Sequence, residues 1–367
     1  MADVLLLRRW SRYVSSMFSL NHISDFASLE CDAIIDVRSP SEFAHDHVPG
    51  AINLPVLNDD ERAQVGRIYK QVSSFAARKT GAALVFRNAA AHIETQLADK
   101  PGGWRPLVYC WRGGQRSGAF SWMLNQIGWP AQTLSGGYKS FRRTIVDYIY
   151  DNALPLRIIR LAGHTGTGKT ELLAKVRARG LQSIDLEALA QHRGSLLGGL
   201  DTGQPSQKAF ETRLAFELQG LDPSRPVLVE AESSKIGEVA LPPALWNAMK
   251  SSPIIEVTAP LDARAHYLAR AYASVLENGA ELKRKLEPLR RFRGHEVVDH
   301  WHALIDQGDR VALCQSLADR HYDPAYSKTH REQGVRPIAT FNMHAVSPDA
   351  LDRAARELVW EVQSISI

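Results

Sequence analysis

"LRIIRLAGHTGTGKTELLAKV" occupies residues 156–176 and decides the fold of the second half of the chain. An apolar, β-branched run leads into a glycine-rich loop, and a helical pattern follows the loop. The loop, "GHTGTGKT" at 163–170, matches the pattern G-x-x-x-x-G-K-[ST] in full. Because such a match rarely arises by chance between a strand and a helix, it predicts a phosphate-binding P-loop at the edge of an α/β sheet.

Each position of this loop has a chemical reason. Glycines let successive backbone N–H groups face one anion at a helix N-terminus. Lys169 can reach terminal phosphates, and the Thr170 hydroxyl can bind Mg²⁺ together with Glu230 at the end of the run "VLVEAES" (227–233). The predicted phosphate-binding set is Gly163, Thr165, Gly166, Gly168, Lys169, Thr170 and Glu230. The ligand stays open between a nucleoside triphosphate and the pyrophosphate of another substrate.

Two α/β domains are expected from the order of the other segments. "CDAIIDVR" (31–38), "RPLVYC" (105–110) and "AQTLSGGY" (131–138) indicate strands of a parallel sheet, and 117–128 has helical spacing. The predicted domains are residues 20–145 with a helical insertion near 57–103, a P-loop α/β domain over 156–260, and a helical C-terminal region over 261–367.

The composition indicates which class of protein this is. The 367 residues are 44% apolar and 23% charged, which is typical of soluble globular proteins. No apolar run approaches the roughly 20 residues that cross a bilayer. Three cysteines lie far apart without C-x-x-C spacing, so a disulfide framework or a zinc site is not indicated, and a reduced, cytoplasmic location is expected.

A second glycine loop, "YCWRGGQRSG" at 109–118, follows a predicted strand. A nucleophilic cysteine needs a depressed pKa, which backbone N–H groups, arginines or a helix N-terminus supply. The polar loop makes burial of this cysteine among apolar groups unexpected. The predicted site has Cys110, Arg112 and Arg116 as catalytic residues, with Gly113, Gly114 and Gln115 as an anion cradle. Cys110 and Arg116 have the spacing of cysteine-dependent phosphatases, so phosphoryl transfer and chalcogen transfer both remain open.

A basic cluster, "KRKLEPLRRFR", packs six Lys and Arg residues into positions 283–293. It indicates either a solvated helix face or a stripe that contacts RNA phosphates. The candidate RNA contacts are Lys283, Lys285, Arg290, Arg291 and Arg293. His295, His300 and His302 follow it, and they are expected on a helix surface rather than at a metal.

"DVRSPSEFAHDHVPGAINLP" (36–55) resembles the N-terminal signature of the rhodanese family, with Asp46 at a turn position where glycine is common. Asp36 and Arg38 within it are expected to form a structural ion pair. From about residue 20 to 330 the chain resembles the bacterial tRNA 2-selenouridine synthase family, a rhodanese-like domain fused to a P-loop domain. The segments that carry this resemblance are "YCWRGGQRSG", "LSGGYKSFRR" (134–143), "GHTGTGKT", "HRGSLLGG" (192–199), "QPSQKAFETRL" (204–214), "VEAESSKIG" (229–237) and "RHYDPAYSK" (320–328). Ala231 stands where that family more often has Asp.

This resemblance implies a tRNA-modifying transferase with tRNA as partner at its anticodon region, a selenophosphate source and no membrane. Wobble 2-thiouridine would be alkylated by geranyl diphosphate, and selenium from selenophosphate would then displace the S-geranyl group. The P-loop would hold pyrophosphate with Mg²⁺, and Cys110 would carry selenium. "HRGS" (192–195), Tyr322 and Tyr326 would contact RNA or prenyl chain, or pack within the domain. The alternative is a rhodanese-type sulfurtransferase or cysteine-dependent phosphatase coupled to a nucleotide-binding P-loop domain.

Overall fold

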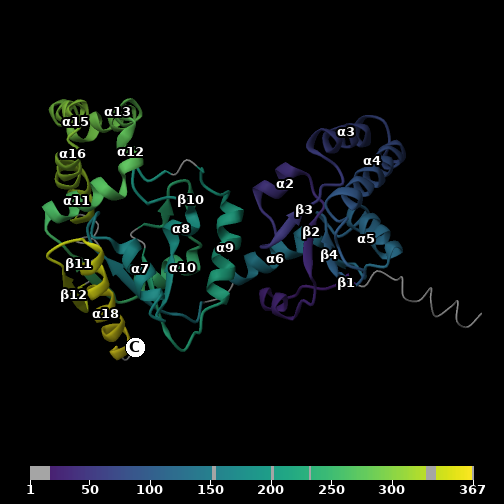
Figure 1. Cartoon of the computed structure of the whole chain (residues 1–367), viewed down its shortest axis with the longest axis horizontal. Coiled ribbons are helices and arrows are strands. Elements are labelled where there is room, and N and C mark those ends of the chain that lie inside the picture. Colours follow the sequence, from purple (N-terminus) through teal and green to yellow (C-terminus); the bar gives the residue numbers. More distant parts are fainter. Residues whose placement is uncertain (1–16, 151–153, 200–201, 231–232, 328–335, 366–367) are drawn as a thin grey trace, which may run out of the picture. The chain divides into compact units, whose positions relative to one another are not determined.

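The computed structural model describes residues 17–150, 154–199, 202–230, 233–327 and 336–365 (Figure 1). By their contacts the described residues form two compact units. The first unit combines the described residues up to 150 with residues 205–219, and the second contains the remainder. Both units carry a parallel sheet with helices, so the predicted α/β class is confirmed. In the part of the chain that the structure describes, no helix is long and apolar enough to cross a membrane.

The first unit is built on five parallel strands whose carboxyl ends gather at one edge. In spatial order they are β1 (Met17–Phe18), β5 (Gln132–Leu134), β4 (Pro106–Tyr109), β2 (Ala33–Asp36) and β3 (Ala51–Asn53). All four residues of β4 are buried, as expected of a central strand whose both faces are covered. The helices are η2 (Ile23–Ser28), α2 (Pro40–His45), α3 (Asp59–Gln71), α4 (Ser74–Thr95), α5 (Gln115–Ile127), α6 (Gly137–Tyr150) and α9 (Gln207–Gln219).

Helix α9 is the unexpected member of this unit. In the sequence it lies inside the stretch predicted as one continuous P-loop domain, between two strands of the second sheet. It packs on α6 and η2 instead. Phe216 of α9 lies against Phe26 and Phe141, with ring centroids 5.5 and 6.4 Å away. These aromatic contacts are long-range, so no local pattern in the sequence signals them.

The second unit is built on another five-stranded parallel sheet. Its order is β12 (Ala339–Asn342), β11 (Ile254–Thr258), β6 (Arg157–Ala162), β8 (Pro226–Glu230) and β7 (Gln182–Asp185). Strand β12 comes from the region expected to be helical and pairs with β11, with Ile255 opposite Ala339. A short antiparallel pair joins β9 (Lys235–Ile236) to β10 (Val239–Ala240).

Helices of the second unit cover this sheet and form the C-terminal part. They are α7 (Lys169–Arg177), α8 (Leu186–Ala190), α10 (Pro243–Ser251), α11 (Leu261–Ala271), α12 (Ala273–Glu277), α13 (Gly279–Leu286), η3 (Glu287–Leu289), α14 (Arg290–Arg293), α15 (His295–Gln307), α16 (Arg310–Leu317), η4 (Ala318–Tyr322) and α18 (Pro348–Ser364). Ile159 of β6, Val257 of β11 and Trp301 of α15 belong to one buried apolar core. That core fixes the end of β6, where the P-loop begins.

Candidate functional site

Cys110 follows β4 directly and lies at the carboxyl end of the central strand of its sheet. Its side chain is buried, with 3% exposed, in an apolar cluster that includes Val108 and Phe120. The expectation that a polar loop would keep this thiol out of the core is therefore wrong. Trp111 and Arg112, the next two residues, are the ones that face solvent, so the loop turns outward only after the sulfur.

Three donors surround the sulfur of Cys110. The hydroxyl of Ser117 donates to Sγ over 3.2 Å, and the backbone N–H groups of Ser117 and Arg112 also point to it. Burial alone would raise the pKa of this thiol. The donors and the charge of Arg116 outweigh burial and lower the pKa below its usual value. Ser117 was not among the predicted site residues, although its place in the first turn of α5 could have suggested it.

The two arginines of the loop act differently. Arg112 is exposed and contributes its backbone N–H to the sulfur. Arg116 is half-buried, and its Nη1 lies 3.2 Å from Oε2 of Glu42. Glu42 also pairs with Arg62 over 2.8 Å, and the two guanidinium groups hold the pKa of its carboxyl below the usual value although burial would raise it. Gly114 caps α5 and Gln115 is its first residue, so the cradle ends at a helix N-terminus.

The segment "SGGYK" at 135–139 supports the cysteine loop from behind. Tyr138 donates its backbone N–H to the carbonyl of Cys110 over 2.8 Å, and Lys139 donates to that of Trp111 over 2.9 Å. Gly137 has φ +59°, and a Cβ there would overlap the carbonyl oxygen of Cys110. Only glycine therefore lets these two loops lie backbone to backbone.

Beneath the loop lies a buried polar network. Asp36 and Arg38 form the expected ion pair at 2.6 Å, with both side chains fully buried, and the Arg38 guanidinium stacks 3.9 Å from the Tyr138 ring. Asp46 is also buried and accepts hydrogen bonds from Tyr138 over 2.7 Å and from Thr212 of α9 over 3.1 Å. Asp46, at the turn position where the signature commonly has glycine, is thus a buried member of this network.

In the second unit, the loop after β6 has the geometry of an anion nest. Gly163, Gly166 and Gly168 have positive φ, and Gly168 is the N-cap of α7. Lys169 begins α7 and donates from Nζ to the carbonyl oxygens of Gly163 and His164. Its ammonium therefore lies over the loop, where the phosphates of a ligand would replace those carbonyls.

Thr170 and Glu230, the two residues expected to bind Mg²⁺, lie next to each other. The Thr170 hydroxyl lies 3.4 Å from Oε1 of Glu230, which is buried at the end of β8. Both are hard oxygen donors, the kind that Mg²⁺ takes alongside phosphate oxygens, so this pair fits the ion. Ala231 and Glu232, which follow, lie outside the described residues.

Arg264 of α11 also contacts the P-loop, although no sequence pattern singles it out. It is buried, donates to the carbonyl of Thr165 over 3.1 Å, and forms a two-pronged ion pair with Asp323 at 2.7 and 2.9 Å. The P-loop is therefore held in place by the C-terminal helices. Because Asp323 lies 59 residues from Arg264 in the chain, no local spacing reveals the pair.

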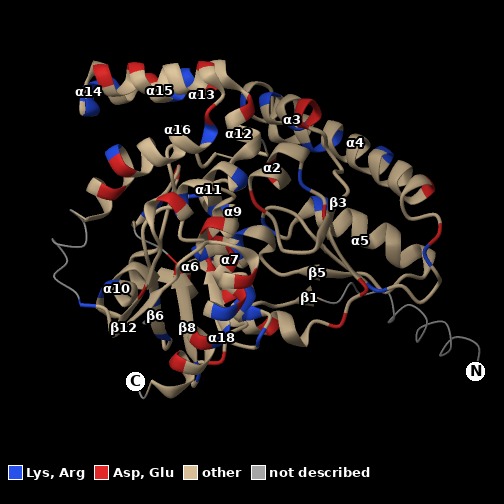
Figure 2. Ribbon diagram, turned by 60° about the vertical axis from the view of Figure 1, so that its left-hand side comes forward, with Lys and Arg blue, Asp and Glu red and all other residues tan. Residues whose placement is uncertain are grey.

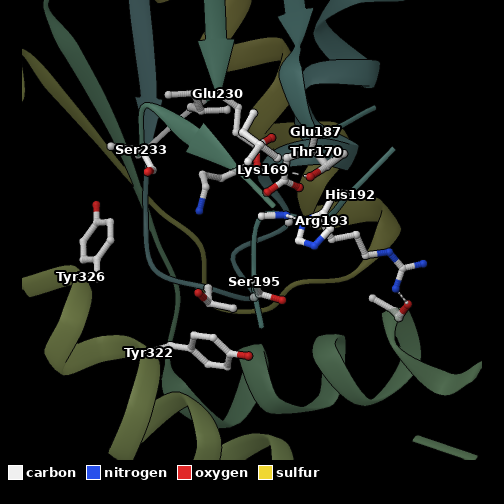
Figure 3. Close-up of a pocket in the computed structure, with 18 of the residues that line it drawn as sticks. Lys169, Thr170, Glu187, His192, Arg193, Ser195, Glu230, Ser233, Tyr322 and Tyr326 are labelled. Carbon is white, nitrogen blue, oxygen red and sulfur yellow. Dashed lines mark hydrogen bonds between the residues drawn. The ribbon is translucent and has the colours of Figure 1, made fainter. Parts of the chain in front are cut away.

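The P-loop opens into a cavity of about 660 Å³ (Figure 3). Lys169 and Thr170 lie on one side, and Tyr322 and Tyr326 lie across from them. Leu196, Leu268, Tyr267 and Tyr272 extend the apolar wall. Residues 192–195 line the same cavity, where Arg193 lies 4.8 Å from the Tyr272 ring and donates to Ala271 over 2.8 Å. One end of the cavity therefore suits phosphate and the other suits an apolar chain.

The basic cluster at 283–293 is largely compensated by acidic neighbours, and blue and red segments alternate along α13 to α15 (Figure 2). Lys283 pairs with Asp306 at 2.6 Å, Lys285 with Glu281 at 3.7 Å, Arg290 with Glu287 and Asp299 at 2.7 and 2.6 Å, and Arg293 bonds to His321. His302 lies 3.7 Å from Glu287 and Arg290 bonds to His295. Among the described residues, no group of three His, Cys, Asp or Glu side chains could hold a metal ion.

Comparison with known proteins identifies both domains of the chain. The family model described as the tRNA 2-selenouridine synthase AAA domain matches residues 156–355, and that of the rhodanese-like domain matches 22–144. The chain belongs to the tRNA 2-selenouridine synthase family. The predicted resemblance, including the rhodanese-like first domain, is confirmed.

Three proteins named tRNA 2-selenouridine synthase illustrate the extent of this family likeness. The one from Cupriavidus pinatubonensis is 33% identical over 88% of this chain and 95% of its own. Those from Hahella chejuensis and Nitrosomonas europaea are 38% and 39% identical over 72% and 65% of this chain. The match spans 67% and 63% of the length of these two proteins. The likeness therefore covers both units.

Proposed function

We propose that this chain converts wobble 2-thiouridine of tRNA to 2-selenouridine through S-geranyl-2-thiouridine, with geranyl diphosphate and selenophosphate as co-substrates. The observation that carries the proposal is the cavity of the second unit, which joins a phosphate loop to an aromatic wall. A prenyl diphosphate has these two ends, whereas a nucleoside triphosphate has a polar base and ribose. Relatives of this family are named tRNA 2-selenouridine synthase, which supports the conversion of a tRNA uridine to 2-selenouridine, and cytoplasmic tRNA would be the substrate.

In the first step the thiocarbonyl sulfur attacks C1 of geranyl diphosphate. The C1–O bond breaks, pyrophosphate leaves, and the uridine loses its N3 proton. Lys169 and the loop N–H groups would stabilise charge as it develops on pyrophosphate. Thr170 and Glu230 would hold Mg²⁺, which would supply further positive charge for the leaving group. Tyr322 and Tyr326 would shield the prenyl chain from water.

In the second step Cys110 is the nucleophile. Selenium in selenophosphate is already fully reduced, so loading it on Cys110 as a perselenide requires a two-electron acceptor. Attack of the thiolate on phosphorus requires none, because the electron pair of the P–Se bond leaves on selenium. Hydrogen selenide then adds to C2 of the S-geranyl uridine, the C2–S bond breaks, and geranylthiol leaves after taking a proton. Water returns phosphocysteine to the thiol and orthophosphate. The spacing of Cys110 and Arg116 suits this role.

A reconstituted reaction tests the proposal. The full chain, a 2-thiouridine tRNA, geranyl diphosphate, Mg²⁺ and selenophosphate should give 2-selenouridine by mass analysis of nucleosides. Cys110→Ser should stop at S-geranyl-2-thiouridine, and full selenation by this variant would contradict the role of Cys110. A quenched digest should contain phosphorylated Cys110; a peptide with the isotope pattern of selenium would show that the cysteine carries selenium instead. Thiosulfate-to-cyanide transfer or phosphatase turnover without tRNA modification would favour the alternative enzymes.

A further inference from the structure

The hairpin formed by α3 and α4 has an unusual distribution of charge. Its acidic residues are confined to the ends: Asp59, Asp60 and Glu61 begin α3, and Glu94 is near the end of α4. Between Arg62 and Ile93 the sequence has six Lys and Arg residues and no Asp or Glu. Every Asp, Glu, Lys or Arg position in these 32 residues is therefore basic.

Two of these six cations are neutralised and four are not. Arg62 pairs with Glu42 and Arg87 pairs with Glu61, at 2.8 and 3.5 Å. The other four are Arg67, Lys70, Arg78 and Lys79, which are all exposed. Within the described residues they form no ion pair. They lie on the last turns of α3 and the first turns of α4, so the free charge is gathered at the turn of the hairpin.

The same turn exposes large apolar side chains. Tyr69, Val72 and Phe75 are 64, 72 and 70% exposed. We call these three residues and the four free cations the hairpin tip. Rings and cations exposed together suit single-stranded nucleic acid, because the cations contact phosphates and unstacked bases pack on the rings. If Tyr69 and Phe75 served only to pack the fold, their rings would be covered by other side chains.

We propose that the hairpin tip binds the tRNA substrate through its phosphates and the unpaired bases of the anticodon arm. This inference rests on the proposed function, which supplies a polyanion with unstacked bases as the partner. It relocates the RNA contact from the 283–293 cluster, where carboxylates already occupy most cations. Counterion release makes this contact salt-dependent. The logarithm of the binding constant should fall with the logarithm of the salt concentration, with a slope of roughly 0.7 to 0.9 per contacted phosphate.

Binding of 2-thiouridine tRNA to the full chain, measured over a range of salt concentrations, tests the inference. Lys70→Gln/Arg78→Gln/Lys79→Gln should weaken binding roughly 10- to 100-fold at 0.1 M salt and lower the salt slope by about two. Lys250→Gln/Arg310→Gln/Arg353→Gln removes equal charge from exposed positions elsewhere and should change binding less than about threefold. Equal losses in both triple variants would overturn the inference.

The aromatic part has its own control. Phe75→Ala should weaken tRNA binding several-fold without changing the salt slope, whereas Phe292→Ala, at a ring that is also 70% exposed, should leave it unchanged. Circular dichroism melting confirms that each variant folds. If the hairpin triple variant keeps tRNA affinity but loses binding to phosphatidylserine vesicles, the tip docks on lipid and the inference fails. Wild-type protein that binds no tRNA would overturn the proposed function itself, whereas intact tRNA binding by the variant overturns only this inference.

Discussion

Tyr138 donates its backbone N–H to the carbonyl oxygen of Cys110 over 2.8 Å. Its hydroxyl donates to the buried carboxylate of Asp46 over 2.7 Å. A single residue thus joins the cysteine loop to the polar network beneath it, and its two bonds can be separated by mutation.

Tyr138→Phe removes only the hydroxyl bond. The buried carboxylate of Asp46 then still accepts a hydrogen bond from Thr212 but loses the one from Tyr138. The free energy of unfolding should therefore fall by about 1–3 kcal/mol. Tyr148→Phe on the same helix is the control, because the hydroxyl of Tyr148 has no hydrogen bond within the described residues. Urea titration of both variants measures the difference. Thiol reactivity of Cys110 should be preserved in Tyr138→Phe, since the backbone bond remains.

Ser117→Ala should raise the pKa of the Cys110 thiol, because it removes a hydroxyl that donates to the thiolate. At neutral pH less of the sulfur is then ionised, so alkylation by iodoacetamide should slow several-fold and its pH midpoint should rise. Ser121→Ala, one turn further along α5, lacks this bond and serves as the control. Equal pH profiles for the two variants would remove Ser117 from the site.

Gly137→Ala should disrupt the cysteine loop. The added Cβ would overlap the Cys110 carbonyl, and φ at this position is +59°. Overlap and strain together should cost roughly 2 kcal/mol or more and abolish selenation. Gly118→Ala adds a Cβ that meets no atom within 4 Å, so thermal unfolding of that variant should be unchanged or slightly raised.

Varying the length of the prenyl chain tests whether the apolar wall of the cavity binds that chain. Each buried carbon contributes about 0.8 kcal/mol, so removing one five-carbon isoprene unit should cost about 4 kcal/mol and weaken binding by roughly 700-fold. Competition calorimetry with dimethylallyl and geranyl diphosphates measures this ratio. Inorganic pyrophosphate that binds as tightly as geranyl diphosphate would place the chain outside the cavity, and tighter binding of ATP would favour a nucleotide.

Thr170→Val should reduce the Mg²⁺ dependence of geranyl diphosphate binding, because the hydroxyl beside Glu230 is lost while side-chain shape is kept. Thr170→Ser retains the hydroxyl and should behave like the wild-type protein. Titration of Mg²⁺ at fixed ligand concentration separates the two. The reactivity of Cys110 with iodoacetamide should be the same in both variants.

Most residues of the cysteine loop and of the P-loop could be predicted from the sequence, because each loop is formed by residues that are close together in the chain. Gly163 to Thr170 and Cys110 to Arg116 each form a site from consecutive residues, and the spacing carries the chemistry. Burial of Cys110 was missed because a polar loop says nothing about the side of the strand on which the sulfur lies. Ser117 was missed because its hydroxyl becomes a donor only once α5 has formed.

Long-range partners explain the other differences. Arg264 and Asp323 meet across the P-loop, and Thr212 meets Asp46 from 166 residues away. The edge strand β12 follows the long helical stretch that begins with α11. The helical pattern of that stretch therefore hides the strand that comes after it. Charge runs mislead for the same reason: Asp306, the partner of Lys283, and Asp299, one of the two carboxylate partners of Arg290, lie on α15, beyond the basic run itself.

The position of α9 has a consequence for how the chain matures. The first unit lacks Thr212 and Phe216 until synthesis has passed residue 219, when two strands of the second sheet, β6 and β7, have already been made. A fragment that stops at residue 150 would leave Asp46 short of a donor and Phe141 without its neighbour on α9. The cysteine unit can therefore reach its final packing only as part of the longer polypeptide, so its folding is coupled to that of the phosphate unit by the order of translation.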